Sequence, residues 1–496
     1  MNRTLSPRPL AALLAAQLLL SACTATAQPP YPPAAQWPEP QPQAGSRPQV
    51  MPARPQFQAP SASHCARPIQ TREVPGHEGQ NTPPYLPYGA APAHSRREKA
   101  EAAVTGSVAA AAPAGAMAAP PAPASGALAK AAGRFSAAAA PLVAQSSPPR
   151  PAPRRAEVVT AGMVDDNAAF SEYLAFRNRT PVVHRPRDVS ERYLLEVKDR
   201  SGHAVADAEV AVQSADGAAM WARTDTAGRV WLHPRAFDPG QAAVYDVTVR
   251  KQGRLAHGVL RRGQKSAVEV VLPQQPGVAQ RARLDLVFLI DATGSMADEI
   301  HKLKTSLRSI ADEVARLPSQ PDLCFGLVAY RDRGDAFLLR SHDFTNDLGA
   351  FQGVLNALQA GGGGDYPEAM NEALHETVHA LSWRGEGATR LVVLLADAPP
   401  HLDYGGPYYD DDMLAALGKG IKVFSVGASG LDKQGEYIQR QIAQYTGGRF
   451  VFLTYADAHR PSSGPGRETV HDVSNYSVDT LDRLIVRLVG DELGRL

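Results

Sequence analysis

The sequence predicts an α/β fold in the C-terminal half of the chain: a doubly wound, mostly parallel sheet with helices on both faces. Residues 284–290 form an uninterrupted apolar run that ends in Asp291, as expected of a strand buried on both faces. Apolar side chains then recur three and four residues apart from Ile300 to Leu317, the pattern of one buried helical face. Further apolar runs of strand length follow at 325–330, 391–396, 422–427 and 450–453.

The first 23 residues predict export. Arg3 and Arg8 precede an apolar run, 10–20, that is too short to span a bilayer and is typical of a secretory signal. Leu20-Ser21-Ala22-Cys23 then resembles a bacterial lipobox, which implies acylation of Cys23 and, because the next residue is not aspartate, an outer-membrane lipoprotein of the cell envelope. The alternative is cleavage after Ala27, which would leave a soluble periplasmic or secreted protein.

Residues 24–160 are rich in Pro, Ala, Gln and Ser and poor in aromatic residues. A segment of this composition buries too little apolar surface to fold, so we predict a disordered tether. It contains Cys65, whereas Cys324 belongs to a predicted core strand. A disulfide between a disordered segment and a core strand is unfavourable for packing, so no disulfide is predicted.

Two modules are predicted between the tether and the α/β domain. Phe170, Tyr173 and Phe176 predict a short helix within residues 161–190. Residues 191–273 contain short alternating runs with turn residues about every ten positions, which predicts a small antiparallel β-sandwich. The order of these strands resembles the carboxypeptidase-regulatory-like or transthyretin-like modules, which implies a spacer or binding platform. The α/β domain is then assigned to 282–460, and 461–496 to a linker and a C-terminal helix.

Asp291, Thr293 and Ser295 form the candidate site. They follow a buried strand, and ligands of parallel sheets bind outside the carboxyl ends of the strands. One carboxylate and two hydroxyls are oxygen ligands, which suit a hard cation such as Mg²⁺. The alternative is that a hydroxyl caps the next helix and Asp291 favours its N-terminal dipole.

These residues match the first loop, Asp-x-Ser/Thr-x-Ser, of the von Willebrand factor type A domain, which the segment resembles over about 282–456. The resemblance implies a Rossmann-like fold and a metal-ion-dependent adhesion site for Mg²⁺, or for Mn²⁺ or Ca²⁺. Asp397 ends a buried strand in the place of the third-loop aspartate, and Asp365 follows four glycines where the family has a threonine. We therefore expect Asp365 to add a carboxylate to the cation's ligands, directly or through water. The alternative is that Asp365 points away and that the run of glycines is only a flexible turn.

The composition and motifs favour binding over catalysis. A net charge of +1 and a charged fraction of 20% argue against a nucleic-acid partner. The first hypothesis is a non-enzymatic, lipid-anchored envelope protein whose cation accepts an acidic group from a protein or other envelope macromolecule. His375-Glu376-Thr377-Val378-His379 matches the zincin pattern and gives a second hypothesis, a zinc metallohydrolase, with His401 available as a third ligand. A structural scaffold with a purely stabilising metal is the third.

Overall fold

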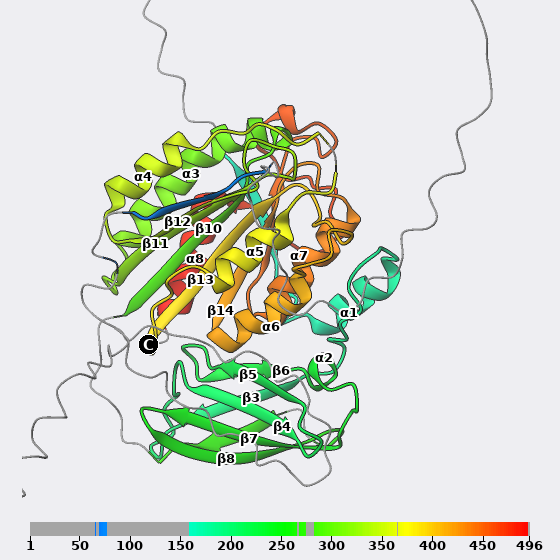
Figure 1. Ribbon diagram of the computed structural model, residues 1–496, viewed down its shortest axis with the longest axis vertical. Coiled ribbons are helices and arrows are strands. Elements are labelled where there is room, and N and C mark those ends of the chain that lie inside the picture. The colour runs from blue at the N-terminus through cyan, green and yellow to red at the C-terminus, as the bar shows by residue number, and fades with distance from the viewer. Residues whose placement is uncertain are drawn as a thin grey trace, which may run out of the picture. The chain divides into compact units, whose positions relative to one another are not determined.

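The computed structural model describes residues 65, 69–76, 158–264, 267–273, 282–364 and 366–494. Within these residues a nine-stranded sheet has the order β1-β12-β11-β10-β13-β14-β15-β2-β16 (Figure 1). Its strands are β1 (Thr71–Val74), β2 (Thr160–Val164), β10 (Arg283–Asp291), β11 (Asp322–Tyr330), β12 (Leu339–Thr345), β13 (Ala388–Ala396), β14 (Ile421–Gly427), β15 (Phe450–Thr454) and β16 (Asp479–Thr480). The predicted α/β class is confirmed.

The centre of the sheet is parallel. β10 pairs in parallel with both β11 and β13, and β14 connects β13 to β15 by two further parallel ladders. Parallel strands end at the same edge of a sheet, so the residues that follow β10, β11 and β13 lie close together. This edge carries the predicted cation site.

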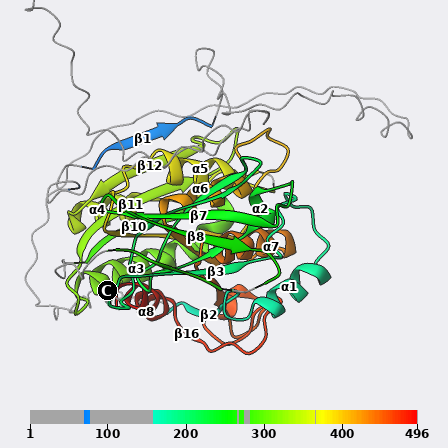
Figure 2. The ribbon, with the colours of Figure 1, turned by 90° about the horizontal axis from the view of Figure 1, so that it is seen from below.

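Helices cover both faces of the sheet because β10 is apolar on both sides. Val287 and Leu289 share a core with α5 (Met370–His379), α6 (Tyr409–Lys419) and α7 (Lys433–Tyr445). Leu286 and Phe288 share a second core with α3 (Ala297–Ala315), α4 (Leu348–Ala357) and α8 (Leu481–Leu493). Helices α3 and α8 lie side by side on this second face (Figure 2). Among the described residues, no helix has the length and apolar character needed to cross a bilayer.

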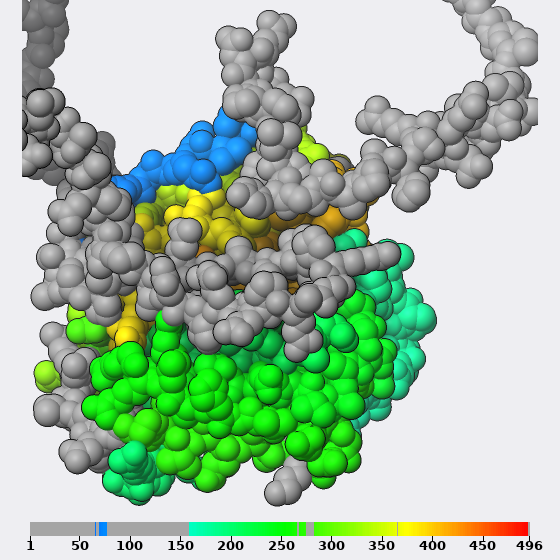
Figure 3. Space-filling view, turned by 60° about the horizontal axis from the view of Figure 1, so that its bottom comes forward, coloured from blue at the N-terminus to red at the C-terminus, as the bar shows by residue number. Residues whose placement is uncertain are grey.

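The edges of the sheet differ from the sequence-based expectation. β1 pairs antiparallel with β12, so residues 71–74 of the predicted disordered tether form an ordered edge strand (Figure 2). The atoms of this segment, blue in Figure 3, lie on the surface of the domain. At the opposite edge, β2 pairs with β15, although its segment was predicted to be helical. Gly162 is required there, because a Cβ atom would lie 2.5 Å from the Phe452 ring. The predicted helix starts later, as α1 (Phe170–Arg179).

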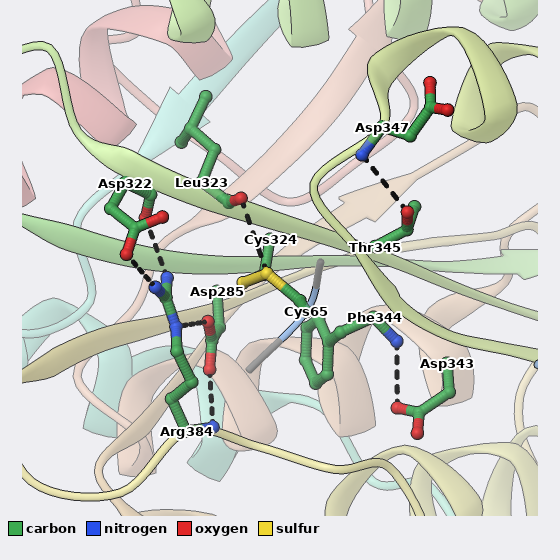
Figure 4. The surroundings of a disulfide bond; sticks show 10 residues. All are labelled: Cys65, Asp285, Asp322, Leu323, Cys324, Asp343, Phe344, Thr345, Asp347 and Arg384. Atoms are coloured by element: carbon green, nitrogen blue, oxygen red, sulfur yellow. Dashed lines mark hydrogen bonds and ion pairs between the residues drawn. A yellow bond between two sulfur atoms is a disulfide. The ribbon is translucent and has the colours of Figure 1, made fainter. Parts of the chain in front are cut away.

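Cys65 and Cys324 form a disulfide, with Cα atoms 6.0 Å apart, so the prediction of no disulfide is wrong (Figure 4). The packing objection fails because Cys65 is itself buried, and the strand that follows it is paired with β12. Arg72 of β1 also donates from Nε to Glu376 Oε1 of α5 at 3.0 Å. The disulfide, the strand pairing and this ion pair all attach the N-terminal segment to the domain. Of the predicted tether, residues 24–64, 66–68 and 77–157 lie outside the described residues.

The strand-rich segment before the α/β domain contains two small sheets. One has the order β6-β3-β9 and the other β5-β4-β7-β8. The strands are β3 (Tyr193–Lys198), β4 (Glu209–Ser214), β5 (Ala219–Arg223), β6 (Arg229–Leu232), β7 (Val244–Lys251), β8 (Arg254–Arg261) and β9 (Ala267–Val271), and the helix α2 (Pro234–Phe237) follows β6. β3 and β9 pair in parallel, so the expectation of wholly antiparallel sheets is wrong for that pair.

A buried ionic network joins this segment to the α/β domain. Asp207 accepts from Arg223 Nε at 2.6 Å and from Arg390 Nη1 of β13 at 3.0 Å. Burial alone would raise the pKa of Asp207, but the charges of Arg223 and Arg390 outweigh it and hold this pKa below the usual 3.8. The carboxylate is thus stabilised in its charged form.

This network predicts an acid-sensitive contribution to stability. A depressed folded-state pKa adds stability above pH 3.8 that is lost as pH falls through 3.8 towards the folded pKa. Asp207→Asn should lower the free energy of unfolding by about 1–3 kcal/mol near neutral pH, and the difference should shrink towards about pH 2.5. Urea unfolding across this range measures it, with Asp216→Asn, at an exposed position, as the control. A pH-independent difference would contradict the assignment.

Candidate metal site

The first loop of the site begins where β10 ends. Asp291 and Thr293 are fully buried, and Thr293 donates to Asp291 Oδ1 from its backbone nitrogen at 3.0 Å and from Oγ1 at 2.7 Å. Thr293 Oγ1 lies 3.1 Å from the hydroxyl of exposed Ser295. The chain then enters the short helix η1 (Gly294–Met296) and α3, and no side chain caps either start. The alternative that Thr293 or Ser295 caps a helix is therefore wrong for these two helices.

Asp397 follows β13 and completes a pair of buried carboxylates. Asp291 Oδ2 and Asp397 Oδ1 are both buried and have no hydrogen-bond partner among the described residues. Burial, and then the charge of Asp397, raise the pKa of Asp291 to about 7. Burial raises the pKa of Asp397, which the Ser295 hydroxyl partly offsets. Ionising two buried carboxylates costs free energy when their oxygens lack hydrogen bonds and no cation is present. These residues therefore fit a bound cation.

The second loop, Gly361–Gly364, packs against the first. Gly294 donates to the Gly362 carbonyl oxygen at 3.0 Å, and Gly363 donates to Asp335 Oδ2 at 2.9 Å. Gly363 has φ +69°, and a Cβ atom there would lie 2.9 Å from Thr293 Cβ. Only glycine allows this close approach without strain. The predicted ligand Asp365, which follows Gly364 in the sequence, lies outside the described residues.

The loop after β11 supports the site from the side. Arg331 donates from Nε to the Ala292 carbonyl oxygen at 3.1 Å and from Nη2 to that of Gln359 at 3.0 Å. It therefore ties the first loop to the chain that leads into the second. Asp335 is the acid of an Arg-Gly-Asp tripeptide. Its carboxylate accepts the hydrogen bond from the Gly363 backbone nitrogen, so it is engaged within the domain.

Sequence reasoning did not identify Tyr330 and Glu299 as neighbours of the site. Tyr330 is fully buried, and burial followed by the charge of Asp291 raises its pKa well above 10.0. Glu299, in the first turn of α3, accepts a hydrogen bond from Ser429 of the loop after β14. In the sequence, Tyr330 is the last residue of an apolar strand pattern. Glu299 is an ordinary acidic residue in the first turn of a predicted helix. Neither pattern signals a site.

The zincin residues do not form the site that their motif predicts. Glu376 is buried, and its carboxylate accepts from Arg72 and, at 2.8 Å, from Ser341 Oγ. His401 stacks on Tyr404 at 3.7 Å and pairs with Asp403 at 2.9 Å. The expected third ligand is therefore committed elsewhere, and the motif glutamate is neutralised by an arginine.

Two tyrosines that follow Asp397 in the sequence contact Arg185. Tyr409 is fully buried in the core and accepts a hydrogen bond from the Arg185 backbone nitrogen at 3.0 Å. Tyr408 lies beneath the Arg185 guanidinium at 3.9 Å. Both contacts attach the segment before the β-rich region to the α/β domain.

The chain contains a von Willebrand factor A domain, because residues 285–400 match the model of that family. Domains of this class are generally protein-interaction modules, and many of them hold a divalent cation at a metal-ion-dependent adhesion site. The matched residues include Asp291, Thr293, Ser295 and Asp397. The α/β fold and the family match therefore assign this part of the chain to the von Willebrand factor A domains. Four of the five predicted cation ligands lie among the described residues.

Several curated proteins are similar to part of this chain. Alpha-protein kinase vwkA of Dictyostelium discoideum is 30% identical over 119 residues, 24% of this chain and 19% of the kinase. The putative ariadne-like RING finger protein R811 of Acanthamoeba polyphaga mimivirus is 29% identical over 121 residues, 24% and 12% of the two chains. Von Willebrand factor A domain-containing protein 7 of Mus musculus is 36% identical over 89 residues, 18% and 9%. The chain thus spans less than a fifth of each relative.

Among solved structures, the open conformation of the pilus adhesin SpaC from Lactobacillus rhamnosus GG is similar over 42% of this chain and 31% of that chain. The sequence identity is 15% and the TM-score 0.27. A second crystal form of the same adhesin gives a TM-score of 0.25.

Proposed function

We propose that this protein binds a macromolecular partner through a divalent cation held by Asp291, Thr293, Ser295 and Asp397. One observation carries the proposal: Asp291 and Asp397 are two buried carboxylates, and each has an oxygen without a hydrogen-bond partner among the described residues. The charge of Asp397 adds to burial in raising the pKa of Asp291. A cation between them would satisfy both oxygens and remove the repulsion. The predicted ligand Asp365 would add a third carboxylate.

Mg²⁺ is the preferred cation, with Mn²⁺ or Ca²⁺ as alternatives, because every donor is an oxygen. The bound ion would supply a positive charge with an open position at the protein surface. Asp291 and Asp397 would supply the counter-charge, whereas the exposed Ser295 hydroxyl marks the side from which an acidic group of the partner approaches. Arg331 and Asp335 would keep the loops in place during binding. The proposed role is recognition of a partner, without catalysis.

The proposed place of action is the bacterial cell envelope, with an acylated Cys23 as anchor. Cys23 lies outside the described residues, so this part rests on the lipobox resemblance. The Cys65–Cys324 disulfide supports export, because disulfides persist in oxidising compartments such as the periplasm. The zinc-hydrolase alternative is disfavoured by the engagement of Glu376 with Arg72.

Thermal unfolding with and without Mg²⁺ tests the cation site. A ligand that binds only the folded state stabilises it by about 2.7 kcal/mol at 100 times its Kd. We expect such a gain in the full-length protein and none in Asp291→Asn. In chelator, Asp291→Asn should be at least as stable as the wild type above pH 7, because it removes the repulsion between Asp291 and Asp397.

Asp298→Asn is the matched control, because Asp298 is an exposed carboxylate in the first turn of α3, near the site. It should keep the full Mg²⁺ effect. Equal stabilisation of Asp291→Asn and the wild type would sink the proposed site. Mg²⁺ stabilisation without Mg²⁺-dependent capture of any envelope fraction would leave the purely structural hypothesis in its place.

A further inference from the structure

We propose that His375, His379 and Asp412 form a second metal site, between α5 and α6, that binds a transition-metal ion of the Zn²⁺ class. His375 Nδ1 and His379 Nε2 each lie 2.9 Å from Asp412 Oδ1. One ligand atom from each residue lies within 4.8 Å of the others. The two imidazole rings, one helical turn apart on α5, have centroids 4.4 Å apart and face the same carboxylate of α6.

The Asp412 carboxylate is only partly satisfied by the protein. Its side chain is 3% exposed, and Oδ2 is buried without a hydrogen-bond partner among the described residues. The neighbouring carboxylates differ, since Asp410 and Asp411 both pair with Arg187, at 2.7 and 2.6 Å. Lys419, on the same helix, donates to the Val378 carbonyl oxygen at 2.7 Å. A bound cation would therefore neutralise the one acid of this turn that faces imidazoles.

The ligand set selects the metal. Two imidazoles and one carboxylate suit Zn²⁺ and its first-row neighbours, whereas Mg²⁺ and Ca²⁺ prefer oxygen ligands. Zinc binds imidazole nitrogen and carboxylate oxygen at about 2.0–2.2 Å, so tetrahedral ligand atoms lie roughly 3.3 Å apart. The two imidazole nitrogens lie 2.9 Å from Asp412 Oδ1, so a small outward shift of this oxygen from each nitrogen would admit the ion. The two histidine side chains are 32% and 34% exposed, so the site is open to metal from solution and keeps a position for water.

This site differs from the zincin motif in ligands and in chemistry. Its third ligand is Asp412, which lies 33 residues beyond His379 on another helix, and not His401. Glu376 accepts hydrogen bonds from Arg72 and Ser341, so no free carboxylate is present there to activate a water molecule. The consequence of metal binding is a cross-link between α5 and α6, and hence higher stability, without hydrolysis.

Titration of the chelator-treated, full-length protein with Zn²⁺ tests the site. We expect one equivalent that binds wild type at least about tenfold more tightly than His379→Gln or His375→Gln. Co²⁺, used as a spectroscopic probe, should give the intense visible bands of a tetrahedral site in the wild type and lose them in both variants. Because both histidines are a third exposed, these variants should fold, and their far-ultraviolet circular dichroism checks this.

Three further variants separate this site from other zinc binding, which matters in a chain with 14 histidines. His301→Gln, at an exposed position of α3, and Asp298→Asn, in the first turn of the same helix, should bind Zn²⁺ like the wild type. Asp412→Asn should lose the Co²⁺ bands while it keeps the size of the side chain. Unchanged Zn²⁺ affinity in His375→Gln and His379→Gln would refute the proposal. Its failure would leave the Mg²⁺ effect at Asp291 unaffected, so the two proposals fail separately.

Discussion

Arg384→Met should lower the free energy of unfolding by about 3–5 kcal/mol, because it leaves a buried carboxylate without its partner. Arg384 is fully buried, donates from Nε to Asp285 Oδ1 at 2.6 Å and from Nη1 to Asp322 Oδ2 at 2.8 Å (Figure 4). Its backbone nitrogen also donates to Asp285 Oδ2 at 2.7 Å. Asp285 lies near the start of β10, the strand that ends in Asp291, so the loss acts on the element that positions the site.

Urea unfolding of the full-length protein measures this loss. Arg179→Met is the matched control: the Arg179–Asp472 pair has similar geometry, with a shortest distance of 2.8 Å, but both side chains are about half exposed. An exposed pair contributes only about 0–1 kcal/mol. The double variant Asp285→Leu with Arg384→Met should recover much of the loss, since it leaves neither charge unpaired. Equal losses at Arg384 and Arg179 would show that burial does not set the energy here.

The central strands of the fold were predictable because their residues are apolar on both faces. Residues 284–290 gave that signal, and the helix from Ile300 showed a clear 3.6-residue period. The edges were not predictable. Residues 71–74 are mostly polar and exposed, and residues 160–164 include a glycine, so neither has the alternation of a half-buried strand. Their positions depend on Cys324, β12 and Phe452, which are far away in sequence.

The candidate cation site was predictable to the extent that its residues are adjacent to strand ends. Asp291, Thr293 and Ser295 are close in sequence, and Asp397 ends an equally apolar strand, so parallel pairing brings them to one edge. Only two of the three ligands of the proposed second site, His375 and His379, could be predicted from the sequence. Helical spacing placed the two imidazoles together, but Asp412 lies on another helix in an acidic run, where the sequence does not distinguish it from Asp410 and Asp411.

Cys65→Ser should lower the free energy of unfolding by about 2–5 kcal/mol, because the disulfide with Cys324 limits the unfolded chain. The loop that it closes spans 259 residues, and long loops lose the most conformational entropy when closed. Cys65 is also 4% exposed, so its release would let solvent reach the Cys324 side of β11.

The same variant should free β1 from the sheet edge. Without the disulfide, β1 keeps only its four-residue pairing with β12 and side-chain contacts such as Arg72–Glu376. Hydrogen exchange at 71–74 should therefore speed up more than exchange in β13, which lies in the centre of the sheet. Cys23→Ser is the control, since it removes the third cysteine of the chain. Wild-type stability and unchanged protection of β1 in Cys65→Ser would mean that strand pairing alone holds the N-terminal segment, and that the disulfide is dispensable.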